Sequence, residues 1–347
     1  MNPATSSAHP RVSICLPNLN QRVFLPERID SILGQSFTDW ELIVGDSFST
    51  DGSWEYLQER LGKDPRCTLL QLPPGLYDAW NACLRQCTGE FIYIAPADDT
   101  MSRDCLQSMV EALDEHPDCD IAHCNLTVID AAGHSIDGFY RDKCDVARYF
   151  GELLDQAHIR KAPHDGLLHY MGSSVYVSLT QLLIRKSLFD RIGLFRNDLG
   201  SAADFEWGMR AGLTANTIHI PAALASWRLH KQQATSFENL QSVQSTLQLL
   251  RMTRVARSSV GQPTANLNDC RHLNFEKPLF MQAIARDLNP TRSIIEKGFK
   301  AGKWFFRAPA CTLHHLALRF LRQHFDPVRW IRTQFTRHNL NHLISRL

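Results

Sequence analysis

The sequence lacks long hydrophobic runs, and it has no excess of charge of one sign. No stretch approaches the roughly 20 uninterrupted apolar residues with which a helix crosses a bilayer. Charged residues make up 21% of the chain and balance to a formal net charge of +1. This balance argues against a disordered polyelectrolyte, and it argues against nucleic acid as a partner of the whole protein.

Paired cysteines and glycine-rich phosphate loops are also missing. None of the ten cysteines stands in a Cys-x-x-Cys pair, so we do not expect a zinc ribbon or a thioredoxin-like site. The segment from Met1 to Pro10 is polar, without a basic start and an apolar run, so we do not expect a secretory signal. We therefore interpret the cysteines as reduced, buried thiols of a cytoplasmic protein. The absence of Gly-x-Gly-x-x-Gly and of Gly-x-x-x-x-Gly-Lys-Ser/Thr argues against a Rossmann oxidoreductase or a P-loop enzyme.

What the first half does contain is a regular alternation of apolar runs and helical spacing. Strands are predicted over residues 12–16, 41–45, 68–72 and 91–95, and helices over 26–33, 53–61, 77–87 and 102–116. Strands and helices that alternate at this spacing predict an α/β fold with a mostly parallel sheet, covered by helices on both faces. In such sheets, ligands bind beyond the carboxyl ends of the strands.

The second half is less regular. A turn at residues 131–133 predicts a hairpin of two strands over 121–129 and 135–140, and a strand and a helix are predicted over 178–184 and 185–192. The stretch 142–170 has no clear period, which fits either a mobile acceptor loop or an excursion of surface helix. A polar helix over 241–257, a linker over 262–269 and a basic tail follow. We therefore predict one domain over 1–235 and a mainly helical C-terminal extension over 236–347.

Carboxylates stand where the predicted strands end. Asp98 and Asp99 directly follow the fourth strand, and two adjacent carboxylates repel each other unless a cation lies beside them. A hard divalent cation with a diphosphate would fit this pair, although capping of the next helix is the alternative. Asp46 ends the second strand, where a carboxylate can accept hydrogen bonds from a nucleobase or a ribose. Asp51 before Gly52 is better suited to shape the turn.

Five segments, taken in order, resemble the inverting family 2 glycosyltransferases. They are VSICLPNLN (12–20), ELIVGDSFSTDGS (41–53), GLYDAWN (75–81), TGEFIYIAPADD (88–99) and WRLH (227–230). The resemblance covers about residues 11–236 and implies a GT-A type fold. It also implies a nucleotide-diphospho-sugar donor, a UDP-sugar first of all, and Mn²⁺ or Mg²⁺ as cofactor.

The resemblance implies a role for individual residues. Asp46 would contact the donor base, Asp98 the ribose and the metal, and Asp99 the metal directly. Asp204 would be the catalytic base, and His230 would approach the metal or the diphosphate. The remaining residues on the donor side are Pro17, Asn18, Asn20, Asp78 and Asn81.

The chain departs from the family pattern in three places. Ser47 and Phe48 stand where an Asp and a Gly are common, and Pro96 replaces the first acid of the DXD-like run. Ala203 replaces the usual Glu beside the base, which makes Glu206 the alternative base. Two residues apart on a helix, Glu206 and Asp204 would face different ways, so we expect only one of them in the cleft.

These features predict an inverting glycosyltransferase that acts on a glycan or lipid-linked acceptor in surface polysaccharide or lipid-linked glycan synthesis. The alternatives are a non-catalytic nucleotide-sugar-binding module and another nucleotide-dependent transferase on a similar α/β fold. In the tail from Lys297 on, basic residues recur beside aromatic ones. That mixture suits peripheral contact with an anionic membrane, here the inner face of the plasma membrane. The alternative is that these helices pack on the catalytic domain.

Overall fold

The computed structural model describes residues 9–170, 174–231 and 233, single positions between 277 and 288, and residues 294–321 and 324–347. The helix predicted over 241–257 and the linker predicted over 262–269 lie outside these residues. In the described part, a ten-stranded sheet runs through the molecule in the order β10-β7-β9-β6-β8-β4-β1-β2-β3, with the short β5 paired to β9.

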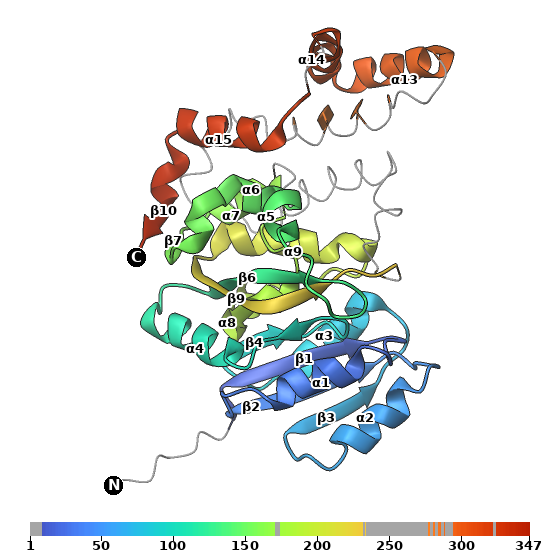
Figure 1. Cartoon of the computed structure of the whole chain (residues 1–347), viewed down its shortest axis with the longest axis vertical. Helices are drawn as coiled ribbons and strands as arrows, with labels where there is room; N and C mark the ends of the chain where they lie inside the picture. Colours follow the sequence, from blue (N-terminus) through green and yellow to red (C-terminus); the bar gives the residue numbers. More distant parts are fainter. Residues whose placement is uncertain are drawn as a thin grey trace.

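The first half of the chain forms the parallel part of this sheet, as predicted (Figure 1). Strands β2, β1 and β4 are fully buried or nearly so, because their continuous apolar runs meet helices on both faces. The parallel strands are β1 (Val12–Asn18), β2 (Trp40–Asp46), β3 (Cys67–Gln71) and β4 (Phe91–Ile94). The helices that follow them are α1 (Leu25–Leu33), α2 (Ser53–Leu61), α3 (Leu76–Gln86) and α4 (Cys105–Glu115).

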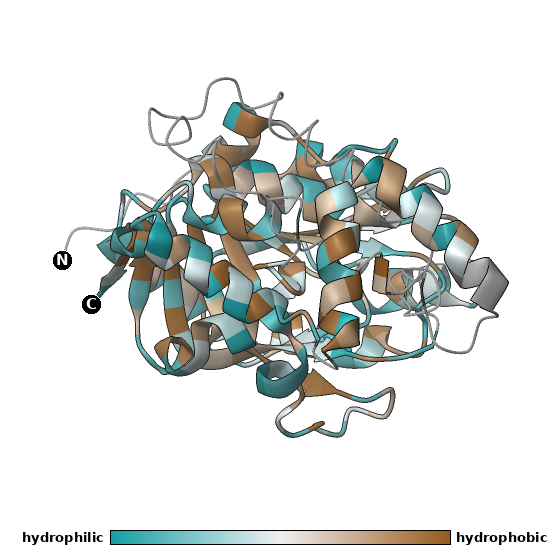
Figure 2. Ribbon diagram, turned by 90° about the horizontal axis from the view of Figure 1, so that it is seen from above, coloured by the Kyte–Doolittle hydropathy of each residue, from teal (hydrophilic) through white to brown (hydrophobic). Residues whose placement is uncertain are grey.

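Beyond β4 the sheet becomes mixed. Strand β8 pairs antiparallel to both β4 and β6, β6 pairs parallel to β9, and β7 pairs antiparallel to β9. These strands are β6 (Ile121–Ile129), β7 (His158–Arg160), β8 (Leu182–Arg185) and β9 (Thr217–Arg228). Helices α8 (Lys186–Ile192) and α9 (Ala203–Thr214) connect β8 to β9. The helix ribbons carry both hydrophilic and hydrophobic residues (Figure 2), as amphipathic helices over a buried sheet must.

Two predictions for the middle of the chain are wrong. The strand predicted over 135–140 is reduced to one bridge between Ile129 and Ser135. Gly138, with a φ of 72°, turns the chain into helix α5 (Phe139–Lys143) instead. In the strand predicted over 178–184, the first part is a 3₁₀ turn (Leu179–Gln181), because Ser178 forms a capping box with Gln181.

The stretch 142–170 is an ordered excursion that returns to the sheet. It contains α6 (Asp145–Phe150), a 3₁₀ turn (Gly151–Asp155), β7 and α7 (His164–Tyr170). Of the two expectations for this stretch, the surface-helix excursion is closer. The predicted acceptor role of the stretch stays a prediction.

The C-terminal helices divide into two groups. Helices α13 (Ile294–Arg307) and α14 (Pro309–Phe320) share a small core around Trp304. Helix α15 (Pro327–Arg337) begins at Asp326, whose carboxylate caps it, and buries Ile331 and Phe335 in the main core.

After α15, a 3₁₀ turn (Leu340–Leu343) leads into strand β10 (Ile344–Arg346), which pairs with β7 (Figure 1). The division predicted near residue 235 stays a prediction. In the described residues, however, the main core contains side chains from both sides of that position.

Candidate functional site

A cleft of about 350 Å³ opens at the carboxyl ends of the parallel strands. It lies where α/β sheets place their ligands. Several residues that the sequence singled out line it, together with aromatic side chains from α3 and β9. The lining residues are Pro17, Asn18, Leu19, Gln21, Ser47, Tyr77, Ala79, Trp80, Pro96, Ala97, Asp98, Asp99, Val177, Ser178, Leu179, Asp204, Trp227 and Gln233.

At the ends of β1 and β2, a buried carboxylate is held in a fixed position. Asp46 accepts hydrogen bonds from Asn18 Nδ2 at 2.7 Å, from Ser49 Oγ at 2.7 Å and from the Ser49 backbone N–H at 2.9 Å. Because Asp46 only accepts, Asn18 must turn its amide nitrogen toward it. Asn18 Oδ1 is then buried and has no partner within the described residues. A buried acceptor in a cleft wall is suited to a donor on a ligand.

Asp98, which lines the cleft, lies beside His230. His230 Nε2 and Asp98 Oδ2 lie 2.9 Å apart, and the His230 ring packs on Phe24 with the ring centres at 4.8 Å. Nδ1 of His230 is buried and has no partner in the part of the chain that the structure describes. Arg228 Nε donates to the Asp98 carbonyl at 2.7 Å, which fixes the backbone beneath the pair.

Asp99 lies behind Asp98 and is already engaged. The backbone N–H of Arg228 donates to Asp99 Oδ1 at 2.9 Å, and Ser178 Oγ donates to Asp99 Oδ2 at 2.8 Å. Burial, with the charge of Asp98 beside it, raises the pKa of Asp99 to about 8. The predicted direct contact of Asp99 with the metal stays a prediction, and the geometry favours Asp98 for it.

A two-residue strand brings these segments together. β5 (Thr100–Met101) pairs with Ser226 and Ala225 of β9. This pairing places Asp98, just before β5, next to His230, just after β9. Residues 132 positions apart in the chain therefore lie within hydrogen-bonding distance.

The residues present could supply part of the ligand set of a divalent metal ion. In the described residues, no group of three or more His, Cys, Asp or Glu side chains is placed to hold an ion. Asp98 and His230 supply one carboxylate and one imidazole. A metal held by one or two protein carboxylates normally takes its remaining ligands from substrate phosphates and water. This donor set therefore fits an ion that binds together with a diphosphate.

Asp204 lines the cleft at the first turn of α9. Its Oδ1 accepts the backbone N–H of Phe205 at 2.7 Å, and its own backbone N–H donates to the Tyr77 hydroxyl at 3.3 Å. Burial raises the pKa of Asp204 to about 6. A carboxyl group with this pKa is deprotonated at neutral pH and still basic enough to take a proton.

Glu206, the alternative base, lies outside the cleft. It is fully buried and forms an ion pair with Arg210, at 2.8 Å to Nε and 2.9 Å to Nη2. Arg210 in turn donates to the carbonyl of Leu194 at 2.8 Å. Only one of the two acids faces the cleft, as expected, and it is Asp204.

Besides the buried Asp46, three of the predicted donor-side residues do not line the cleft. Asn20 Oδ1 accepts the Thr50 backbone N–H at 2.8 Å, and Asp78 is exposed and accepts from Asn197 Nδ2 at 2.7 Å. Asn81 bonds to the backbone N–H and C=O of Phe195, at 3.1 and 2.7 Å. In this structure these three side chains hold loops next to the cleft, and their predicted contact with the donor stays untested.

Sequence reasoning missed several residues of the site. Tyr77 and Trp80 stand inside the GLYDAWN segment, so their place in that motif could have pointed to them. Arg228, which holds both Asp98 and Asp99, likewise stands inside the WRLH segment, whereas Ser178, which holds Asp99, gave no such signal. Their roles depend on contacts between distant segments.

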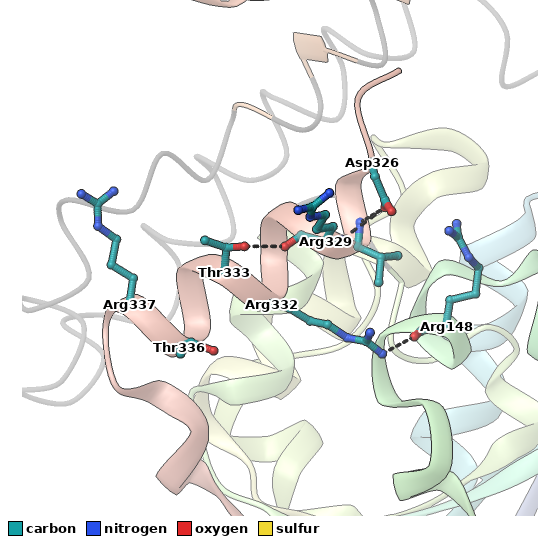
Figure 3. Close-up of a pocket in the computed structure, with 8 residues that line it drawn as sticks. Arg148, Asp326, Arg329, Arg332, Thr333, Thr336 and Arg337 are labelled. Atoms are coloured by element: carbon teal, nitrogen blue, oxygen red, sulfur yellow. Dashed lines mark hydrogen bonds between the residues drawn. The ribbon is translucent and has the colours of Figure 1, made fainter. Parts of the chain in front are cut away.

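A larger hollow, of about 970 Å³, lies along α15 (Figure 3). Its wall is basic: it includes Arg148, Arg329, Arg332 and Arg337. The acid in this wall, Asp326, caps α15, and Arg332 reaches across to the carbonyl of Arg148. None of the acids that the sequence singled out lines this hollow, so we assign the chemistry to the smaller cleft.

Comparison with solved structures identifies the fold. The structure is similar to two glycosyltransferases of GT-A fold. It matches Staphylococcus aureus TarS 1–349 with a TM-score of 0.52 and 18% identity, over 80% of this chain and 79% of that one. It matches the mannosyltransferase PcManGT of Pyrobaculum calidifontis, solved with GDP-Man and Mn²⁺, with a TM-score of 0.51 and 19% identity, over 90% and 88%. The chain therefore has the predicted GT-A fold.

The sequence is similar to a family model and to several curated proteins. The family model described as glycosyl transferase family 2 matches residues 13–163. The chain is 26% identical over 215 residues to the uncharacterized glycosyltransferase EpsJ of Bacillus subtilis, covering 61% of this chain and 58% of EpsJ. It is 25% identical over 284 residues to chondroitin synthase of Escherichia coli, covering 79% of this chain and 37% of that protein. Residues 13–163 of this chain are therefore similar to the family 2 glycosyltransferases, and the curated relatives that it matches include proteins named glycosyltransferases.

The relatives are longer than the matched region. The chain spans little more than half of the first two, EpsJ (58%) and the putative teichuronic acid biosynthesis glycosyltransferase TuaG of Bacillus subtilis (52%). The relatives' substrates and partners therefore do not transfer directly. Among the described helices, none combines the length and the apolar character needed to cross a membrane.

Proposed function

We propose that this protein is a glycosyltransferase that transfers a sugar from a nucleoside-diphosphate sugar, a UDP-sugar first of all, to a glycan or lipid-linked acceptor, with inversion at the anomeric carbon. The observation that carries the proposal is that two carboxylates from distant segments, Asp98 and Asp204, line one cleft. Asp98 lies with His230 at one place, and Asp204 lies at the start of α9. Polysaccharide synthesis is the context that the names of TuaG and chondroitin synthase support.

The donor end of the cleft is built to hold a nucleotide. Asn18, held by Asp46, offers an acceptor to the base, and the predicted contact of Asp46 itself with the base stays a prediction. Asp98 and His230 would hold Mn²⁺ or Mg²⁺ with the diphosphate. When bound, the ion would offset the negative charge that develops on the leaving diphosphate. The neighbour crystallised with GDP-Man and Mn²⁺ supports this assignment.

The acceptor end needs a base. Asp204, with a pKa raised to about 6 by burial, would remove the proton of the attacking hydroxyl as the new glycosidic bond forms. Tyr77 and the Phe205 N–H fix the first turn of α9 on which this carboxylate stands. Inversion follows in this scheme because the hydroxyl attacks the anomeric carbon opposite the leaving diphosphate in a single displacement.

The test is a panel of UDP-, GDP-, CDP- and ADP-sugars, each incubated with and without Mn²⁺ and read by release of the nucleoside diphosphate. We expect release from at least one donor, stimulated by the metal and lost in Asp204→Asn. If the protein releases no diphosphate with any donor, or works equally well after chelation, the proposal is wrong in its donor or its metal.

We also propose that α13 and α14 place the enzyme on an anionic membrane, where a lipid-linked acceptor would lie. These helices expose seven large hydrophobic side chains: Phe299, Phe305, Phe306, Leu313, Leu316, Phe320 and Leu321. Leu313, Leu316 and Phe320 follow helical spacing, so they form one outward stripe of α14. Residues 294–321 contain five Lys or Arg and one acid. Apolar insertion beside basic residues suits anionic head groups.

The alternative expectation, packing on the catalytic domain, holds for α15, whose Ile331 and Phe335 are buried. The α13–α14 surface can be tested by flotation with vesicles of neutral and of anionic lipid. We expect flotation with anionic vesicles, lost in Phe306→Ser/Phe320→Ser and kept in Val23→Ser, which removes an exposed hydrophobic residue elsewhere. Failure of the intact protein to float would end the membrane proposal. A change from dimer to monomer in the double variant would assign the surface to a second copy.

A further inference from the structure

The loop after β2 holds a bulky side chain in an unusual place. Phe48 has a φ of +50°, in the left-handed region, and 52% of its surface is exposed. A bulky residue rarely adopts this conformation, whereas Gly or Asn adopts it readily. The exposed ring gains little from the protein core, so the folded chain alone gives no reason for a Phe here.

Polar contacts on both sides hold Phe48 in this conformation. The Ser47 backbone N–H donates to the Asn18 carbonyl at 2.9 Å, and Ser49 is bonded to Asp46 through both its N–H and its hydroxyl. The Ser49 hydroxyl also accepts the Asn20 backbone N–H at 2.9 Å. The loops after β1 and β2 are thereby tied together, and the Phe48 ring is left outside the packed core. Strain that the surroundings impose in this way is typical of functional sites.

The two tied loops surround the nucleotide end of the cleft. Ser47, directly before Phe48, is buried in the cleft wall, and Leu19 of the other loop lines the cleft with 47% of its surface exposed. Between the loops lies Asn18 Oδ1, the buried acceptor without a partner among the described residues. Exposed apolar side chains around a buried acceptor suit a flat ligand with apolar faces and an N–H on its edge. A nucleobase has both features.

We propose that Phe48 lies against the face of the donor's nucleobase, and that Asn18 Oδ1 accepts a ring N–H from the base's edge. Uracil and guanine carry such a ring N–H, whereas neutral adenine and cytosine do not. Phe48 is then a positioning residue for the donor, and the strained backbone is retained because the ring contributes when the nucleotide binds. This inference rests on the proposed function, since it needs a nucleotide in the cleft.

The test measures binding of UDP, GDP, CDP and ADP, with Mn²⁺ present, by calorimetry. In wild-type protein we expect UDP or GDP to bind most tightly. Phe48→Gly should weaken the binding of that nucleotide by about tenfold, within the range found when an aromatic ring stacked on a base is removed. Pyrophosphate, which has no base, should bind both proteins equally. Phe48→Gly should also keep or raise the melting temperature, because Gly accepts the left-handed backbone.

Matched variants separate stacking from strain. Phe48→Tyr should restore the affinity, because it restores a flat ring. Asn339→Gly replaces another residue with a φ near +50°, at the end of α15, and should leave nucleotide binding unchanged. Val23→Ser removes an exposed hydrophobic residue that does not line the cleft, and it too should leave binding unchanged.

The outcomes distinguish this inference from the proposed function. If wild-type protein binds no nucleoside diphosphate, the proposed function fails and the role of Phe48 falls with it. If wild-type protein binds one and Phe48→Gly binds it equally well, only the role of Phe48 is wrong. If Phe48→Gly weakens the binding of pyrophosphate as much as that of the nucleotide, the substitution has displaced the loop, and the stacking contact is refuted.

Discussion

Asp204 shows how one carboxylate acquires its chemistry from its surroundings. It stands at the start of α9 with its pKa raised to about 6 by burial. We predict that Asp204→Asn keeps donor affinity and lowers turnover by about a hundredfold or more, the usual size of a lost general base. In the wild type, turnover should rise with pH through about 6, because the carboxyl group must lose its proton before it can act. Initial rates from pH 5 to 8 at saturating donor check this.

Glu206 provides the matched control for that substitution. Its partner Arg210 is buried with it, and the Glu206 side chain does not line the cleft. Glu206→Gln should therefore lower the melting temperature, since it leaves a buried guanidinium without its counter-charge, while the pH profile of the folded enzyme stays the same. If the rise of turnover with pH is lost in Glu206→Gln and kept in Asp204→Asn, Glu206 is the base and Asp204 is not.

Asp98 and Asp99 are neighbours in sequence with different environments. Asp98 faces the cleft beside His230, whereas Asp99 holds Arg228 and Ser178. We predict that Asp98→Asn abolishes the Mn²⁺ enhancement of nucleotide binding with little change in stability. Asp99→Asn should keep that enhancement and cost about 1–3 kcal/mol of unfolding free energy, the range for a buried hydrogen bond that is lost. Calorimetric titration and urea unfolding of both variants decide. Loss of metal dependence in a stable Asp99→Asn protein would restore Asp99 as the direct ligand.

At the scale of elements, the position of α9 depends on close contact with α7. A Cβ on Gly212 would lie 2.4 Å from the Gly166 backbone nitrogen, a distance that real side chains do not reach. We predict that Gly212→Ala pushes the two helices apart. It should cost about 1–3 kcal/mol of stability, as overpacking does, and it should lower turnover because α9 carries Asp204.

Gly302→Ala on α13 is the control, since its Cβ would meet open space. That variant should gain about 0.5–1 kcal/mol from helix propensity. Full activity in a stable Gly212→Ala would contradict the prediction.

The elements that the sequence predicted best are those whose signal is local. Helix α2 runs over Ser53–Leu61, the predicted residues, because its apolar spacing and the Gly52 turn before it are both written in that segment. Strands β7 and β10 were missed, since each has three residues and exists only through pairing with a distant partner. The same holds for the site. Asp46, Asp98 and Asp204 follow motifs, whereas Ser178 is in place only because the 3₁₀ turn before β8 packs against Asp99.

At the scale of the whole molecule, a cluster of buried histidines joins the mixed part of the sheet to α7. Its members, buried around the Arg160–Asp165 ion pair, are His123, His158, His164, His169 and His219. Burial lowers the pKa of each, to about 3 for His158 and His219 and about 4 for His169. The folded protein therefore holds them neutral at neutral pH.

This cluster predicts how stability depends on pH. Below pH 6.5 the unfolded chain takes up protons that the folded chain refuses, so stability is complete above that value and falls as pH falls toward the folded pKa values. Each histidine contributes up to about 1.4 kcal/mol per pH unit in this window. Urea unfolding at pH 7.5 and 5.5 should show the loss. His134→Gln, at an exposed residue, should not change it, whereas His169→Phe should reduce it. Equal stability at both pH values would mean that the cluster is already protonated when folded.

The pairing of β5 with β9 also bears on how such an enzyme can diversify. Two residues, Thr100 and Met101, tie the segment that ends in Asp98 to the segment that leads to His230. The excursion through α6 branches off between them and does not take part in this pairing. Under the proposed function, with the predicted acceptor role of this excursion, the donor and the acceptor would be bound by different parts of the chain. A new excursion grafted onto this scaffold would then change the acceptor while the proposed donor site stays in place.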